Sequence, residues 1–157
     1  MFVEYSMRRA ALILLAALGV AACQPKAPQE LAVHNAWVRL PAIPGNPAAA
    51  YFTLQGGPAA DQLVAIESPK AARIELHESR MVDGRMTMGS LATVTIPAGG
   101  TVTFAPAGSH AMLFGVDPAI KPNGTLPLTL RFASGKTLAT DARTVSAGDA
   151  APAHDDH

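Results

Sequence analysis

The sequence predicts an all-β fold, either an antiparallel β-sandwich or a Greek-key barrel. From residue 31 onward no segment keeps a helical period, whereas about nine short runs alternate or have β-rich composition. Regularly spaced short strands separated by turn signals are typical of sandwiches and barrels. The expected strands are residues 33–39, 50–55, 62–67, 72–78, 86–95, 101–104, 110–116, 126–133 and 137–145.

The turns between these runs carry Gly, Pro, Asn and Asp, which adopt the backbone angles that turns need. Asp83-Gly84 between two β-rich runs is a hairpin signal, and it predicts that Met86 and Met88 fold back beside the strand that holds His77. A length of 157 residues with 49% hydrophobic residues fits one domain with a packed core.

The first 22 residues have the pattern of a secretory signal. Arg8-Arg9 form a basic start, and the small, apolar run of residues 10–22 is too short for a typical membrane-spanning helix. Val20-Ala21-Ala22-Cys23 resembles a bacterial lipobox, in which the cysteine is acylated and becomes the mature N-terminus. Cys23 is the single cysteine, so we expect a lipid anchor there and no disulfide or thiolate site in the mature domain.

The chain therefore divides into four parts. Residues 1–22 are the lipoprotein signal peptide, 23–30 a lipidated N-terminus and polar tether, 31–145 the β-domain, and 146–157 a flexible tail. The expected location is the periplasm or cell envelope, with attachment to a membrane through the lipid. Twelve basic residues balance twelve acidic ones without a basic stripe, so nucleic-acid binding has no support.

Methionine and histidine gather in one stretch of the chain. After the leader every methionine (Met81, Met86, Met88 and Met112) lies between residues 81 and 112, and His77 and His110 flank or enter that stretch. Thioether sulfur and neutral imidazole together favour Cu(I) over Zn(II), Ca(II) or Mg(II). In a strand His110 and Met112 share a face, as do Met86 and Met88, so each pair can reach one ion.

Each of these residues also has an ordinary structural interpretation. Methionine fills cores, and a single histidine near an apolar strand is more often hydrogen-bonded than metal-bound. The joint confinement of the methionines to one segment favours the metal site. We expect His77 on the outer face of its strand with Arg73 and Glu75, Trp37 as a core anchor of the first strand, and His34 as structural or surface.

The pattern His77-x10-Met88-x21-His110-x-Met112 resembles the periplasmic copper chaperones of the PCuAC family. Glu75-Leu76-His77-Glu78-Ser79 and Gly108-Ser109-His110-Ala111-Met112 match around the site, and Ala36-Trp37-Val38-Arg39 and Leu126-Pro127-Leu128-Thr129-Leu130 match outside it. The resemblance spans about residues 31 to 145. It implies a cupredoxin-like β-sandwich in which His77, Met88, His110 and Met112 bind Cu(I). This sequence departs from the family pattern in one respect, because Met86 and Met81 are also available as alternative or additional thioethers.

The resemblance further implies a carrier that passes Cu(I) to the copper-site subunit of a respiratory oxidase or to another copper-assembly protein. A periplasmic copper buffer or resistance protein, and a lipoprotein without a ligand, stay open as alternatives. A cupredoxin-like electron-transfer protein ranks lower, because its copper needs a Cys thiolate. We expect no enzyme and no catalytic residues, since no nucleophile with a base and no acid–base pair is visible.

The C-terminal segment Ala153-His154-Asp155-Asp156-His157 is expected to be a solvated terminus. His154 and His157, with the two carboxylates between them, form a second candidate site that would bind Cu(II) loosely.

Overall fold

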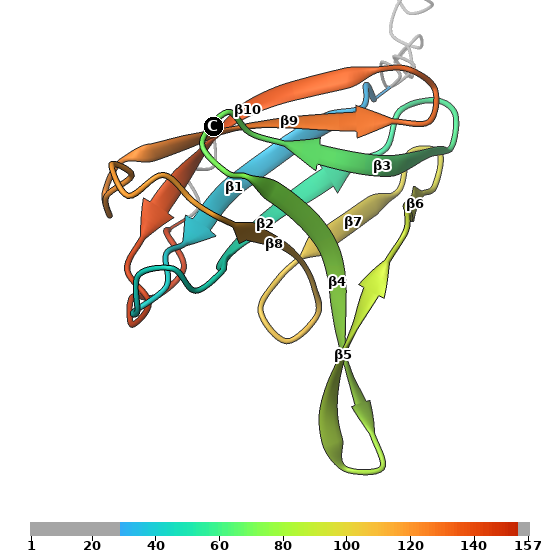
Figure 1. The fold of residues 1–157 in the computed structure, drawn as a ribbon. Helices are drawn as coiled ribbons and strands as arrows, with labels where there is room; N and C mark the ends of the chain where they lie inside the picture. Colours follow the sequence, from blue (N-terminus) through green and yellow to red (C-terminus); the bar gives the residue numbers. More distant parts are fainter. Residues whose placement is uncertain (1–28, 154–157) are drawn as a thin grey trace, which may run out of the picture.

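The computed structural model describes residues 29–153, which form ten β-strands and no helix. None of these residues therefore forms a helix that could cross a membrane. The all-β prediction is confirmed, and Figure 1 shows the arrangement of the strands. The strands are β1 (Ala32–Arg39), β2 (Ala48–Gln55), β3 (Asp61–Glu67), β4 (Arg73–Val82), β5 (Arg85–Leu91), β6 (Val94–Ile96), β7 (Thr101–Phe104), β8 (Ser109–Phe114), β9 (Thr125–Phe132) and β10 (Thr137–Val145).

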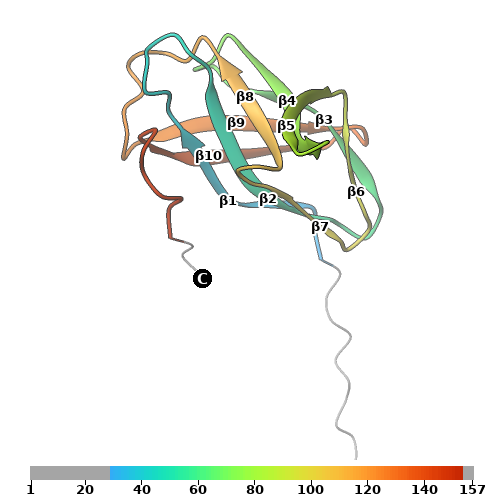
Figure 2. The ribbon, with the colours of Figure 1, turned by 90° about the horizontal axis from the view of Figure 1, so that it is seen from below.

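The strands form one curled sheet in the order β5-β4-β8-β2-β1-β10-β9-β3-β6, and β7 adds to β2. All pairings are antiparallel except that of β1 with β10, where Trp37 lies opposite Arg143. The curl is visible in Figure 2, in which β9 and β10 cross behind β2 and β8. The sheet does not close: its order ends at β5 and β6, and β3 and β4 are in contact without pairing.

Two details of the strand prediction were wrong. The run expected at residues 86–95 is two strands, since β5 ends at Leu91 and β6 begins at Val94 on another partner, β3. The strands were also expected to pair in antiparallel fashion throughout, but β1 and β10 are parallel. Local alternation of side chains does not record which distant strand becomes the partner.

The core lies between the two layers of the curled sheet. It is filled by alternating side chains such as Leu54 of β2, Leu63 of β3, Leu113 of β8 and Leu128 of β9, each with an exposed fraction of 1% or less. Burying such leucines stabilises the fold by about 1.5–3 kcal/mol each.

Trp37 is buried, with an exposed fraction of 6%, as expected for an anchor of the first strand. It lies outside the main hydrophobic cluster, on the outer face of β1, where its ring packs on Tyr51 at a centroid distance of 4.4 Å. Its neighbour Val38 enters the core instead, because successive residues of a strand point to opposite faces. His34 is exposed, as expected.

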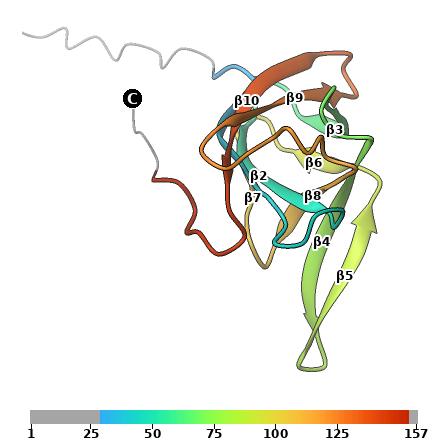
Figure 3. The same cartoon turned by 60° about the vertical axis from the view of Figure 1, so that its left-hand side comes forward.

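The hairpin formed by β4 and β5 extends beyond the rest of the curled sheet (Figures 1 and 3). Asp83 and Gly84 connect its strands with φ angles of 49° and 74°, and two consecutive positive angles define a type I′ turn. The Asp-Gly hairpin signal is therefore confirmed. The hairpin projects away from the end of the domain where the described chain begins and the Gln29 side chain accepts a hydrogen bond from Gln55.

Asp61 fastens the start of β3 to the turn between β9 and β10. Its carboxylate accepts hydrogen bonds from the backbone N–H of Gln62 and from both the backbone N–H and the hydroxyl of Ser134. Desolvation raises the pKa of Asp61, but these hydrogen bonds and the nearby Lys136 ammonium outweigh it and hold the pKa below its ordinary value.

Because the folded state depresses this pKa, the ionised carboxylate stabilises the fold above the pKa of the unfolded chain. That contribution is lost as the pH falls through the lower, folded-state pKa. We expect Asp61→Asn to lower the free energy of unfolding by about 1 kcal/mol at pH 7. The difference from wild type should shrink in acid, below about pH 4. Urea unfolding at several pH values measures it, and a difference that stays constant down to pH 3 would contradict this account.

Candidate metal centre

The two histidines of the predicted site lie side by side. β4 pairs with β8 so that His77 is directly opposite His110, and their rings are nearly parallel with centroids 6.0 Å apart. Directly opposite residues project from the same face of a sheet. Two imidazoles separated by 32 residues in the sequence are thus brought within reach of one ion.

The hydrogen bonds of the rings leave one free nitrogen on each. His110 Nδ1 is 3.0 Å from the carbonyl oxygen of Gly108, which can only accept, so Nδ1 carries the proton and Nε2 keeps its lone pair. His77 Nε2 is 3.1 Å from a carboxylate oxygen of Glu75, which places its proton on Nε2. His77 Nδ1 is buried without a hydrogen-bond partner.

A buried ring nitrogen without a partner costs free energy of folding unless something binds it.

The surroundings of Glu75 support the assignment of the His77 proton to Nε2. Hydrogen bonds from Arg73 and then from His77 hold the pKa of Glu75 below its ordinary value, so the group is an ionised acceptor at neutral pH. A carboxylate that holds a histidine in one tautomer is the usual outer partner of a metal-bound imidazole.

The two methionines of the predicted site share the face of the histidines. Met112 is half-buried, lies two residues after His110 and is opposite Glu75. Met88 lies on β5 opposite Ser79, two residues from His77 along β4, and has an exposed fraction of 57%. The four predicted ligands thus come from three neighbouring strands and one face. Their role as ligands stays a prediction.

Sulfur would be needed to hold an ion here. Within residues 29–153 no three His, Cys, Asp or Glu side chains gather in a cluster that could hold a metal. A set of two imidazoles and two thioethers, with no charged ligand, suits monovalent copper and not zinc. Met81 and Met86 lie farther out on the hairpin. Cys23, His154 and His157 lie outside the described residues.

Sequence reasoning missed several residues around the site. It placed Glu75 beside His77 but gave it no role, although a carboxylate two residues from a histidine in a strand is the available signal. It also missed an aromatic row that continues from His110 through Tyr51 to Trp37, with ring centroids 6.5 Å and then 4.4 Å apart. The guanidinium of Arg39 caps the row, 5.0 Å from the centre of Trp37. Burial raises the pKa of Tyr51, against the opposing charge of Arg39, so its hydroxyl is neutral at physiological pH.

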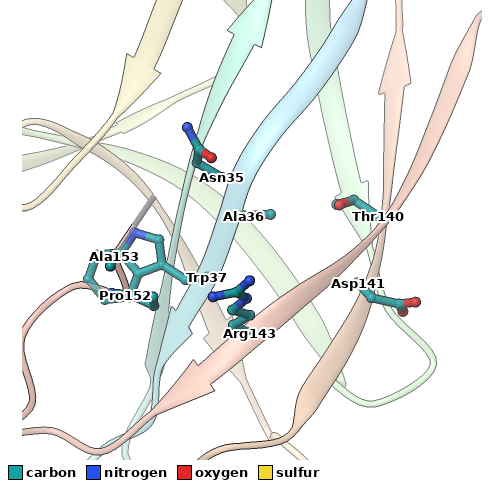
Figure 4. Close-up of a pocket in the computed structure, with 8 residues that line it drawn as sticks. All are labelled: Asn35, Ala36, Trp37, Thr140, Asp141, Arg143, Pro152 and Ala153. Carbon is teal, nitrogen blue, oxygen red and sulfur yellow. The ribbon is translucent and has the colours of Figure 1, made fainter. Parts of the chain in front are cut away.

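A hollow of about 220 Å³ beside Trp37 contains none of the candidate ligands (Figure 4). It lies between β1, β10 and the segment that follows β10, where Pro152 and Ala153 approach the indole. The hollow holds no cluster of metal-binding side chains, so the histidine pair is the better candidate site.

We expect Glu75→Gln to weaken Cu(I) binding by about tenfold, the lower end of the usual effect of removing an outer partner. The lower end applies because the Glu75 side chain is 39% exposed. A neutral amide no longer fixes the proton on His77 Nε2. Competition with a Cu(I) chelator measures the change.

Glu78→Gln is the matched control, since Glu78 lies on the same strand and the opposite face and pairs with Arg80. Equal affinities of the two variants would show that Glu75 does not support the site.

Comparisons with known proteins agree with the fold and extend to the family. Residues 31–144 match the family model described as "Putative lipoprotein LpqE-like". The "Putative lipoprotein Lxx21020" of Leifsonia xyli subsp. xyli is 33% identical over 135 residues, which cover 81% of each chain.

Several solved PCuAC domains have the same fold. The copper-bound PCuAC domain of PmoF2 superposes with a TM-score of 0.61 at 20% identity, covering 77% of this chain and 97% of that domain. The Cu(I) form of DR1885 from Deinococcus radiodurans superposes with a TM-score of 0.53 at 29% identity, covering 80% and 83%. The resemblance to PCuAC proteins is confirmed. The chain belongs to the LpqE-like lipoprotein family and has the cupredoxin-like β fold of the PCuAC copper-binding domains.

Proposed function

We propose that this protein is a copper chaperone and not an enzyme. Cu(I) is its cargo, held by His77 Nδ1, His110 Nε2 and the sulfurs of Met88 and Met112. The observation that carries the proposal is the cross-strand histidine pair, in which one buried nitrogen lacks a partner. The Cu(I)-bound relative DR1885 supports copper as the cargo.

Neutral ligands suit a carrier. Thioethers and imidazoles bind Cu(I) without losing a proton that the metal must displace, and they exchange by stepwise replacement. Met88 is exposed, so a ligand of the receiving protein can approach the ion from that side while the two histidines still hold it. The ion keeps its oxidation state throughout the exchange.

Anaerobic titration tests the binding step. We expect saturation near one equivalent of Cu(I) at the histidine pair, and lower affinity in both Met112→Leu and Met88→Leu. Leucine keeps the size and apolar character of methionine but offers no sulfur. Unchanged affinity in both variants would remove thioether coordination from the proposal.

The receiving partner is proposed to be the copper-site subunit of a respiratory oxidase or another copper-assembly protein. Mixing the loaded chaperone with the copper-free domain of that subunit should move the ion across. Retention of copper by the chaperone against an acceptor of higher affinity would favour a copper buffer.

An intense visible band on adding Cu(II) would instead indicate a thiolate site and electron transfer. The sequence disfavours this alternative, because Cys23 is the single cysteine.

Two proposals concern parts outside the described residues. Acylation of Cys23 would hold the protein on a membrane of the cell envelope, and Cys23→Ser should release it into the soluble fraction.

The tail with His154 and His157 would bind Cu(II) weakly. Deletion of residues 154–157 should lower Cu(II) uptake and leave Cu(I) affinity intact, and an unchanged Cu(II) uptake would dismiss the second site.

A further inference from the structure

The β4–β5 hairpin exposes large apolar side chains that no other described part of the chain covers. Met81, Met86 and Met88 have exposed fractions of 64%, 54% and 57%. The hairpin extends beyond the rest of the sheet, on the side away from the start of the described chain (Figures 1 and 3). Methionine at such positions gives little to folding, because the side chain stays in water. Grouped, exposed apolar side chains often mark an interaction site.

The geometry of the turn brings Met81 and Met86 together. In a two-residue type I′ hairpin the residues that flank the turn, Val82 and Arg85, exchange hydrogen bonds. The next pair, Met81 opposite Met86, is then a non-hydrogen-bonded pair. Such pairs have the closer side chains, with Cα atoms about 4.5 Å apart. Two flexible thioethers at this spacing can meet on one ion.

The two outer rungs of the methionine face, Met81–Met86 and Ser79–Met88, carry no charged side chain. By the alternation of strand residues, Met81, Met86 and Met88 share one face, and Arg80, Arg85 and Glu78 take the other. Glu78 and Arg80 pair with each other there. A cation at the methionine pair therefore meets two neutral sulfurs and no arginine on its own side of the hairpin.

The same face leads to the histidines. Moving inward from the Met81–Met86 rung, the next rung on this face is Ser79–Met88, and the one after it holds His77, opposite His110 on β8. Two rungs of this kind span four residues along the strand, or about 13 Å. Met88 lies midway, so no step exceeds the distance between successive rungs.

We propose that Met81 and Met86 form a second, weaker Cu(I) site, a transit site through which the ion enters or leaves the His77–His110 centre by way of Met88. The inference rests on the proposed function, because it takes Cu(I) as the cargo. Each step exchanges one thioether for another on an ion that stays monovalent, and no proton is released. Two thioethers without imidazole bind more weakly than the four-ligand centre, as a transit site requires.

The first test follows the methionine methyl groups by NMR in protein labelled at those carbons, during anaerobic titration with Cu(I). The first equivalent should shift Met88 and Met112, and the signals of Met81 and Met86 should shift together once more than one equivalent is present. Silence of Met81 and Met86 in excess Cu(I) would overturn the second site.

The second test is the rate of Cu(I) uptake from a chelator complex. The variant Met81→Leu/Met86→Leu keeps the apolar surface and should take up the ion several-fold more slowly, with the affinity of the first equivalent unchanged. Val82→Leu, on the same hairpin and the opposite face, is the matched control and should keep the wild-type rate. A wild-type rate in the double variant would overturn the role in transit.

The two proposals fail in different ways. If the first equivalent of Cu(I) leaves Met88 and Met112 unshifted, the proposed function itself is wrong. If that equivalent binds normally while Met81 and Met86 neither shift nor affect the rate, only the transit site is wrong.

Discussion

His110→Ala is expected to lower the affinity for Cu(I) by roughly 100-fold or more. Loss of a residue that only hydrogen-bonds a metal ligand lowers metal affinity by about 10–100-fold, and loss of the ligand itself should cost more. The imidazole is 6% exposed, and its Nδ1 is held by the carbonyl oxygen of Gly108. That carbonyl also accepts a hydrogen bond from the backbone N–H of Ser79 on β4, so the ring is fixed relative to His77. Alanine removes a candidate ligand that is already oriented.

Competition of the variant with a Cu(I) chelator, under anaerobic conditions, measures this effect. His34→Ala is the matched control, because His34 is an exposed histidine on another strand and its removal should leave the affinity unchanged. Folding of both variants can be checked by the near-ultraviolet signal of Trp37. A His110→Ala protein that is folded and binds as tightly as His34→Ala would refute the site.

Phe104→Ala is expected to lower the free energy of unfolding by about 3–5 kcal/mol, a large part of the stability of a small domain. Phe104 is 2% exposed and stacks on Phe52 with centroids 4.3 Å apart. These rings join the short strand β7 to β2, and alanine leaves a cavity between the layers that rigid neighbouring strands fill only in part.

Urea unfolding followed by circular dichroism measures this loss. Ile43→Ala is the control, since Ile43 is 63% exposed in the loop before β2 and its truncation should change the stability by less than about 0.5 kcal/mol. Similar values for the two variants would mean that the Phe52–Phe104 pair is not a centre of the core. The copper affinity of folded Phe104→Ala should stay close to wild type, because the ring lies in the core and outside the histidine face.

Much of the local structure could be predicted from the sequence. Alternation placed the strands, Asp83-Gly84 placed the hairpin, and the two-residue spacing of His110 and Met112 placed both on one face. These features depend on neighbours in the chain, so a short window contains the information. The face of His77 was also predictable, since Leu76 beside it is buried in the core.

The long-range features could not be derived from spacing. Register decides that His77 lies opposite His110, and register is fixed by pairing between strands that are separated by other strands in the sequence. The burial of Trp37 was predicted, but the face on which it lies was not, because its row with Tyr51 and Arg39 depends on neighbouring strands. The role of Glu75 needed the side-chain contacts with Arg73 and His77.

X-ray absorption at the copper edge of the Cu(I)-loaded protein tests the central claim most directly, because it reports which atoms surround the ion. We predict a mixed shell of nitrogen and sulfur, from His77, His110 and two methionines, with sulfur lost in the Met88→Leu/Met112→Leu variant. A shell of nitrogen and oxygen alone in the wild-type protein, or a sulfur signal unchanged in that variant, would contradict the account.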